Sequence, residues 1–131
     1  MIGADAYILL RLLLNDDVAQ VALVQQRLLQ MTEAREDVLI GPIALAETIW
    51  TLSHRARVPK ADLAEAIRDL GLTRPFRFFD DAVVQAALTL FESGTAGFSD
   101  CLIRAMDSGA GCAQTLTFEQ KALQLPGFVL P

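Results

Sequence analysis

The chain has 131 residues, of which 53% are hydrophobic and 21% are charged, and its formal net charge is −5. This composition is typical of a globular domain and excludes a disordered segment, and the length predicts a single domain over residues 1–131. No apolar run approaches the roughly 18 to 20 residues of a membrane span, and the first residues lack the pattern of a secretory signal. Cys101 and Cys112 are the only cysteines and lack metal-ligand spacing, which predicts a reduced, cytoplasmic protein without membrane contact.

The charge balance narrows the class of partner. The chain carries 16 Asp and Glu residues against 11 Lys and Arg, which argues against a general electrostatic nucleic-acid binder. It does not argue against a nuclease, because divalent cations bound at an acidic site invert the local charge. An acidic surface would equally suit a basic protein partner.

The first part of the chain predicts short strands that alternate with helices. MIGAD is typical of a buried strand, and Asp5 then stands at the N-cap position of a helix over 6–14. A second helix is expected over about 18–33, where apolar residues recur at helical spacing. EDVLIGP predicts a strand that leads into a helix over about 42–57, with Pro42 at its first position.

The second part of the chain continues the alternation. Helices are expected over about 60–70, 81–91 and 99–107. RPFRFF fits a short strand or an extended linker, GCAQTLT a strand, FEQKAL a helical turn, and FVLP a last short strand. Strands separated by helices imply βαβ units, hence an α/β fold with a parallel sheet and helices on both faces.

Four acids stand near the predicted junctions between strands and helices. Asp5 follows the first strand, Glu47 lies about one and a half turns into the helix after VLIGP, Asp100 opens a later helix, and Glu119 follows GCAQTLT. Ligands of such sheets bind at the carboxyl ends of the strands. Clustered carboxylates repel one another unless a cation lies between them, and Mg²⁺ and Mn²⁺ prefer oxygen ligands. The pattern therefore indicates metal-dependent phosphodiester chemistry.

Three of these acids also have ordinary structural explanations. Asp5 fits a helix cap, and Glu119 fits an exposed acid in a turn. Asp100 fits a first-turn acid that complements the helix dipole after Ser99 as the cap. It also stands four residues before Arg104, the spacing of a surface ion pair.

Glu47 is harder to explain structurally. A lone carboxylate on an apolar stripe is costly unless something pairs with it, so this position favours function. The residues three and four positions away from it are Ile43, Ala44, Trp50 and Thr51.

Three segments resemble the successive motifs of PIN-domain proteins: MIGADAYILLRLLLNDD, IGPIALAETIWTL and GFSDCLIRAMDSGAGCAQTLTFEQKALQLPGFVLP. They are most similar to the VapC-type toxins of bacterial type II toxin–antitoxin systems, and the similarity spans nearly the whole chain. The resemblance implies a three-layer α/β/α sandwich with a central parallel sheet and a Mg²⁺- or Mn²⁺-dependent endoribonuclease site. By resemblance, Asp5, Glu47 and Asp100 match the core acids of the family, and Glu119 stands where many relatives have Asp.

The chain departs from the family pattern around two of these acids. Relatives usually follow the first Asp with Thr or Ser and then a small polar residue, where this chain has Ala6 and Tyr7. Many relatives carry a further acid at the position of Gly97. Lost groups around a metal ligand cost roughly 10- to 100-fold in metal affinity or activity, so we expect weakened catalysis. The alternative is a degenerate PIN domain that binds RNA or a protein partner without catalysis.

The resemblance also implies partners. A cognate antitoxin would cover the acidic cleft, RNA would be the substrate, and homodimers are typical of relatives. Arg11 and Lys121 lie near the predicted cleft in sequence and are the candidates for binding RNA phosphates. His54 stands at the end of a helix among basic residues, which fits either the helix dipole or a phosphate-binding patch.

Overall fold

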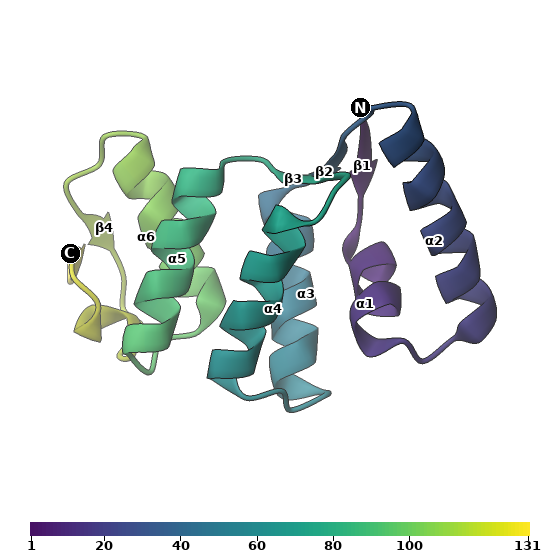
Figure 1. Ribbon diagram of the computed structural model, residues 1–131. Helices are drawn as coiled ribbons and strands as arrows, with labels where there is room; N and C mark the ends of the chain where they lie inside the picture. Colours follow the sequence, from purple (N-terminus) through teal and green to yellow (C-terminus); the bar gives the residue numbers. More distant parts are fainter.

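The computed structural model describes residues 1–131 and contains six α-helices, one short 3₁₀ helix and five short strands (Figure 1). The α-helices are α1 (Ala6–Leu14), α2 (Val18–Glu33), α3 (Pro42–His54), α4 (Lys60–Leu72), α5 (Asp81–Ser93) and α6 (Phe98–Gly109). The strands are β1 (Ile2–Ala4), β2 (Val38–Ile40), β3 (Phe76–Phe78), β4 (Thr115–Leu116) and β5 (Phe128–Val129), and the 3₁₀ helix is η1 (Ala122–Gln124). All strand pairs are parallel, so the predicted α/β class is confirmed.

The strands form two small sheets. β1, β2 and β3 lie in that order in one sheet, and β4 pairs with β5 in the other. In Figure 1, β4 lies at the left beside α6, away from β1, β2 and β3 in the upper part of the view. The prediction of a buried first strand is wrong, because β1 is an edge strand whose only partner is β2. Ile2 is accordingly 37% exposed, and Gly3 is also exposed.

Most of the core lies between helices. α5 packs along α6, α4 lies against α3 and α5, and α3 also contacts α1 and α6. The apolar side chains that point inward recur every three or four residues, which is the spacing of one helix face. On α3, α4 and α5 these residues are Leu45, Ile49 and Leu52; Leu63, Ile67 and Leu70; and Val84, Leu88 and Phe91. This packing positions α3, which carries Glu47, against α6, which carries Asp100, and against α1, which Asp5 caps.

The helix ends follow signals in the local sequence. Asp5 caps α1 as predicted, since its carboxylate accepts a hydrogen bond from the backbone N–H of Ile8 at 3.2 Å. Pro42 is the first residue of α3, also as predicted. α3 ends at His54, before the expected end near Arg57, because Arg57 has a φ of 54° that no right-handed helix can continue. None of the helices has the length and hydropathy of a membrane-spanning segment.

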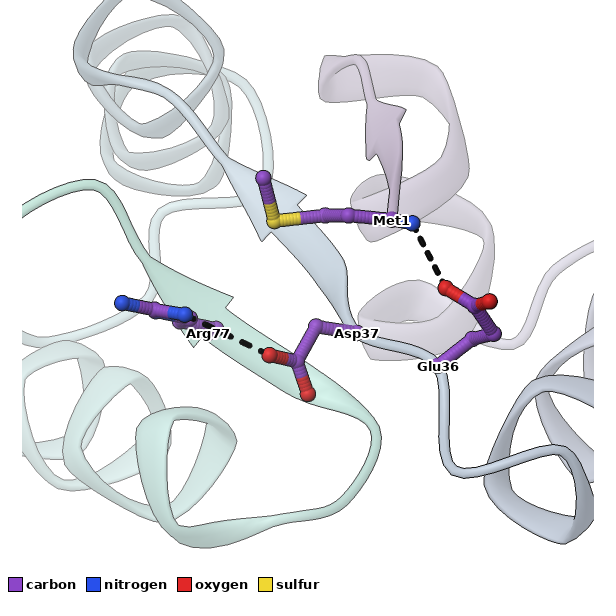
Figure 2. Close-up of polar contacts among 4 residues, drawn as sticks. All are labelled: Met1, Glu36, Asp37 and Arg77. Atoms are coloured by element: carbon purple, nitrogen blue, oxygen red, sulfur yellow. Dashed lines mark hydrogen bonds and ion pairs between the residues drawn. The ribbon is translucent and has the colours of Figure 1, made fainter.

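Two ion pairs lie around the start of β1 and β2 (Figure 2). The amino group of Met1 lies 2.6 Å from a carboxylate oxygen of Glu36, and the Arg77 guanidinium on β3 lies 3.5 Å from Asp37. All four groups are about half exposed or more, so each pair contributes only about 0–1 kcal/mol to stability. Met1, Glu36 and Asp37 precede β1 or β2, and Arg77 lies within β3, whereas Asp5 follows the other end of β1.

Candidate functional site

A groove of about 570 Å³ lies where α1, α3 and α6 meet. Its walls include Glu47 itself, Ala6 next to Asp5, and Ser99 next to Asp100. The other lining residues are Tyr7, Leu10, Arg11, Leu14, Ala46, Trp50, Thr51 and Arg55. The fold therefore brings the segments of three predicted site residues to one concave surface.

Asp5 combines a structural contact with access to solvent. It stands between β1 and α1, is exposed, and uses one carboxylate oxygen to cap α1. An ionised carboxylate has about four acceptor positions on two oxygens, so capping does not exhaust its capacity as a ligand. The helix-cap interpretation is correct for Asp5, and it is compatible with a second role.

Glu47 lies in the groove, but the expectation that its carboxylate is costly to the fold is wrong. Its carboxylate is exposed, and so are its apolar neighbours Ile43, at 74%, and Trp50, at 50%. The reason is the orientation of α3, which buries the opposite side of the helix in the core. Glu47 therefore carries no desolvation cost, and its position in the groove is what supports a role.

Asp100 and Glu119 come from different parts of the chain, and the charge of Glu119 acts on Asp100. Burial raises the pKa of Asp100 above its ordinary value of 3.8, and the negative charge of Glu119 raises it further. Glu119 follows β4 in a loop held by two hydrogen bonds. Its N–H donates to the Thr117 hydroxyl at 3.0 Å, and its carboxylate accepts from the Lys121 N–H at 3.2 Å. Asp100 and Glu119 are thus a like-charged pair.

The surroundings of Asp100 differ from two of the expectations. Gly97, and not Ser99, is the N-cap of α6, and it provides no side-chain cap. Arg104 does not pair with Asp100, because its side chain is 7% exposed and turns inward. Its guanidinium donates to the Thr115 hydroxyl at 2.6 Å and to the Cys112 carbonyl at 2.8 Å. Asp100 therefore has no basic partner.

The two predicted phosphate-binding residues differ in whether other side chains already pair with them. Arg11 lines the groove, but it forms an ion pair with Asp16 at 3.1 Å and a hydrogen bond with the Gln20 side chain. Lys121 is exposed and forms no ion pair, and it follows Glu119 closely in the same loop. Lys121 is therefore the freer of these two cations.

The end of α3 contributes Trp50 and Arg55 to the groove, and His54, for which a phosphate-binding patch was one interpretation, packs against Trp50. The His54 ring stacks on Trp50 with centroids 4.7 Å apart, and its Nδ1 lies 3.0 Å from the Trp50 carbonyl oxygen. The Arg55 guanidinium lies 5.9 Å from the centroid of the Trp50 ring. The available signal was the spacing of Trp50, three residues after Glu47 and so on the same helix face.

The donor chemistry fits a hard cation, but the arrangement of side chains is incomplete. All four predicted ligands are carboxylates, which Mg²⁺ and Mn²⁺ prefer. As the side chains lie, no three His, Cys, Asp or Glu residues are close enough to hold one metal ion. Glu47 thus lies in the groove and Glu119 acts electrostatically on Asp100, and the side chains form no closed set of ligands.

Comparison with known proteins does not identify a family for the chain. No protein-family model matches the chain, and no curated protein matches it.

Proposed function

We propose that the chain is a PIN-domain endoribonuclease of the VapC toxin type, which hydrolyses RNA at the groove between α1, α3 and α6 with Mg²⁺ or Mn²⁺. The observation that carries the proposal is a groove that contains Glu47 and is lined by residues adjacent to Asp5 and Asp100. Ala6 and Ser99 in the groove wall are the immediate neighbours of Asp5 and Asp100. The segments of three of the four acids thus line one concave surface, and the charge of Glu119 acts on Asp100.

The electrostatics support a cationic ligand. Asp100 is partly buried, has no basic partner and is repelled by Glu119, so its charged form is disfavoured. A divalent cation would relieve this repulsion, and a bound metal ion supplies activation of water and stabilisation of charge on the phosphate. Arg55 and Lys121 form no ion pairs and are suited to binding the phosphates on either side.

The proposal extends to fold and partners. The parallel strands and the six helices are compatible with the three-layer α/β/α sandwich of PIN domains. Exposed apolar residues on α2, among them Val18 at 84%, offer a surface for an antitoxin or a second copy. The proposed family would also imply a cytoplasmic location.

A second candidate function is a degenerate PIN domain that binds RNA or a protein partner without cleaving. The residues around two of the acids favour it. Ala6 is buried beside Asp5 and lacks the hydroxyl expected there, and Gly97 supplies no further acid.

The test is RNA cleavage by the purified protein in Mg²⁺, in Mn²⁺ and in EDTA. Asp100→Asn and Glu47→Gln should each reduce metal-dependent cleavage by at least roughly 100-fold, because losses next to metal ligands already cost 10- to 100-fold. Glu65→Gln is the matched control, since Glu65 is an exposed acid on α4 that does not line the groove. It should cleave like the unmodified protein.

The remaining outcomes separate the candidates. If the folded protein cleaves nothing in a varied RNA pool with either metal, the non-catalytic candidate replaces the nuclease. Cleavage that survives both Asp100→Asn and Glu47→Gln would indicate a contaminating nuclease and contradict the assigned site.

A further inference from the structure

Two exposed aromatic side chains line the groove beside Glu47. Tyr7 on α1 is 71% exposed, and Trp50 on α3 is 50% exposed. Other aromatic rings, such as Phe91 and Phe98, pack edge to face within the core. Large apolar rings left in water at a concave surface are typical of a binding site.

The Trp50 ring is held in position by its own helix. His54 stacks on it at an interplanar angle of 15°, and Arg55 lies near its face. The contact between His54 and the Trp50 carbonyl oxygen keeps the imidazole in place. A ring ordered in advance loses little conformational entropy when a ligand stacks on it.

The charges around the two rings select the kind of ligand. Arg55 lines the groove, is exposed and forms no ion pair, so its guanidinium is free to contact an anion. Glu47, Thr51 and Arg11 interrupt the apolar surface, which makes the groove a poor fit for the continuous apolar face of a partner helix. Flat aromatic faces beside a free guanidinium are the features that bind nucleobases and phosphates of single-stranded nucleic acids.

We infer that Tyr7 and Trp50 form a stacking site for one unpaired base of single-stranded RNA, and that Arg55 binds an adjacent phosphate. The inference deepens the proposed function and rests on it, since it places the base beside Glu47. A base within a duplex has both faces covered by its neighbours, so the groove accepts single strands and rejects double helices. Tyr7 and Trp50 are therefore positioning residues for the substrate.

Intrinsic fluorescence tests the inference directly, because Trp50 is the only tryptophan of the chain. The full protein is titrated in EDTA with a short single-stranded RNA of mixed sequence, with the same strand annealed to its complement, and with the same strand made abasic. The single strand should quench the Trp50 emission, and the duplex and the abasic strand should leave it unchanged. EDTA removes cleavage from the experiment.

Variants then assign the contacts, with the anisotropy of labelled RNA as the readout. Tyr7→Ala and Trp50→Ala should each weaken binding by roughly 5- to 150-fold, the range expected for loss of one base–aromatic stack. Arg55→Gln should weaken binding less and reduce its dependence on salt. Ile43→Ala is the control, because Ile43 is exposed on the same helix and does not line the groove. Circular dichroism verifies that each variant is folded.

Several results would overturn the inference. Equal quenching by duplex or abasic RNA, or unchanged binding by folded Tyr7→Ala and Trp50→Ala, would remove the stacking site. Emission that changes with protein concentration and not with RNA would assign the groove to a second copy of the chain. The two proposals also fail separately. Metal-dependent cleavage without quenching supports the nuclease and refutes the stacking site. Specific quenching without cleavage supports the stacking site and refutes the nuclease.

Discussion

Asp100 and Arg104 lie about one turn apart on α6, yet their surroundings are opposite. Arg104 is buried, and oxygen atoms of the loop before β4 and of Thr115 accept its hydrogen bonds. The Thr115 hydroxyl in turn donates to the Asp107 carboxylate at 2.8 Å. Asp100 follows Ser99, which lines the groove, and it forms no ion pair, while the charge of Glu119 raises its pKa in addition to burial.

This comparison distinguishes two uses of charge in one helix. Buried polar groups in native proteins are nearly always satisfied, and Arg104 meets this rule through Thr115 and Asp107. Charged groups that the fold leaves with a perturbed pKa and no partner cluster at functional sites. Substitutions at and around the two residues can establish whether Arg104 stabilises the fold and Asp100 does not.

The largest effect is expected at Arg104. Arg104→Met keeps most of the buried side-chain length but removes the hydrogen bonds to Thr115 and to the Cys112 carbonyl. The free energy of unfolding should fall by about 2–4 kcal/mol, because hydrogen bonds from charged groups are lost and their acceptors stay partly buried. Urea denaturation measures the loss. Arg55→Met, at an exposed site, is the control and should change stability by less than about 0.5 kcal/mol.

A loss below about 1 kcal/mol for Arg104→Met would contradict this assignment. The network around Arg104 would then be dispensable. Arg104 would then not be required for the fold, and it would no longer differ from Asp100 in that respect.

A smaller effect is expected where the backbone approaches Arg104. Gly127 has a φ of 90°, and a Cβ there would lie 2.7 Å from Nε of Arg104. Gly111 has a similar φ of 98° with open space around it. Gly111→Ala should cost about 1 kcal/mol from backbone strain alone, and Gly127→Ala about 1–2 kcal/mol more. Equal losses in urea denaturation would show that Arg104 yields freely to a new methyl group.

Much of the fold could be predicted because its signals are local. The α1 boundaries follow from Asp5 as the N-cap, and α3 begins where Pro42 predicts. The strand around Arg77 was left open between a strand and a linker, and the register with β2 decides for the strand. The exposure of β1 could not be predicted, because an edge strand and a central strand differ only in their neighbours.

The site was less predictable because it depends on contacts between distant segments. That the four acids form one site stays a prediction, and the structure adds only that the charge of Glu119 acts on Asp100. The inward turn of Arg104 depends on Thr115, which reaches it only through the packing of β4 near α6. The exposure of Trp50 depends on which face of α3 meets the core. Both faces of α3 carry apolar residues, so the sequence does not show which face is buried.

The smallest effect concerns the charge of Asp100 itself. Its pKa is raised above 3.8 in the folded protein, so the folded state binds the proton more tightly than the unfolded state. Stability therefore falls as the pH rises from 3.8 through the raised pKa, and the ionised carboxylate destabilises the fold at neutral pH. Asp100→Asn should raise the unfolding free energy at pH 7 by less than about 1 kcal/mol, because solvent screens the partly exposed group. The gain should vanish below pH 3.8, as urea denaturation across that range would show.

The matched control for this prediction is another acid in the first turn of a helix. Asp62 occupies the first turn of α4 and is exposed. Acids in this position stabilise a helix by about 0.3–1 kcal/mol, so Asp62→Asn should lower stability at pH 7. Opposite signs for the two substitutions would mark Asp100 as a charge kept at a cost to the fold, as expected of a ligand for a cation. A loss of stability in both would make Asp100 an ordinary helix-dipole residue, and Glu119 would then have no measurable influence on it.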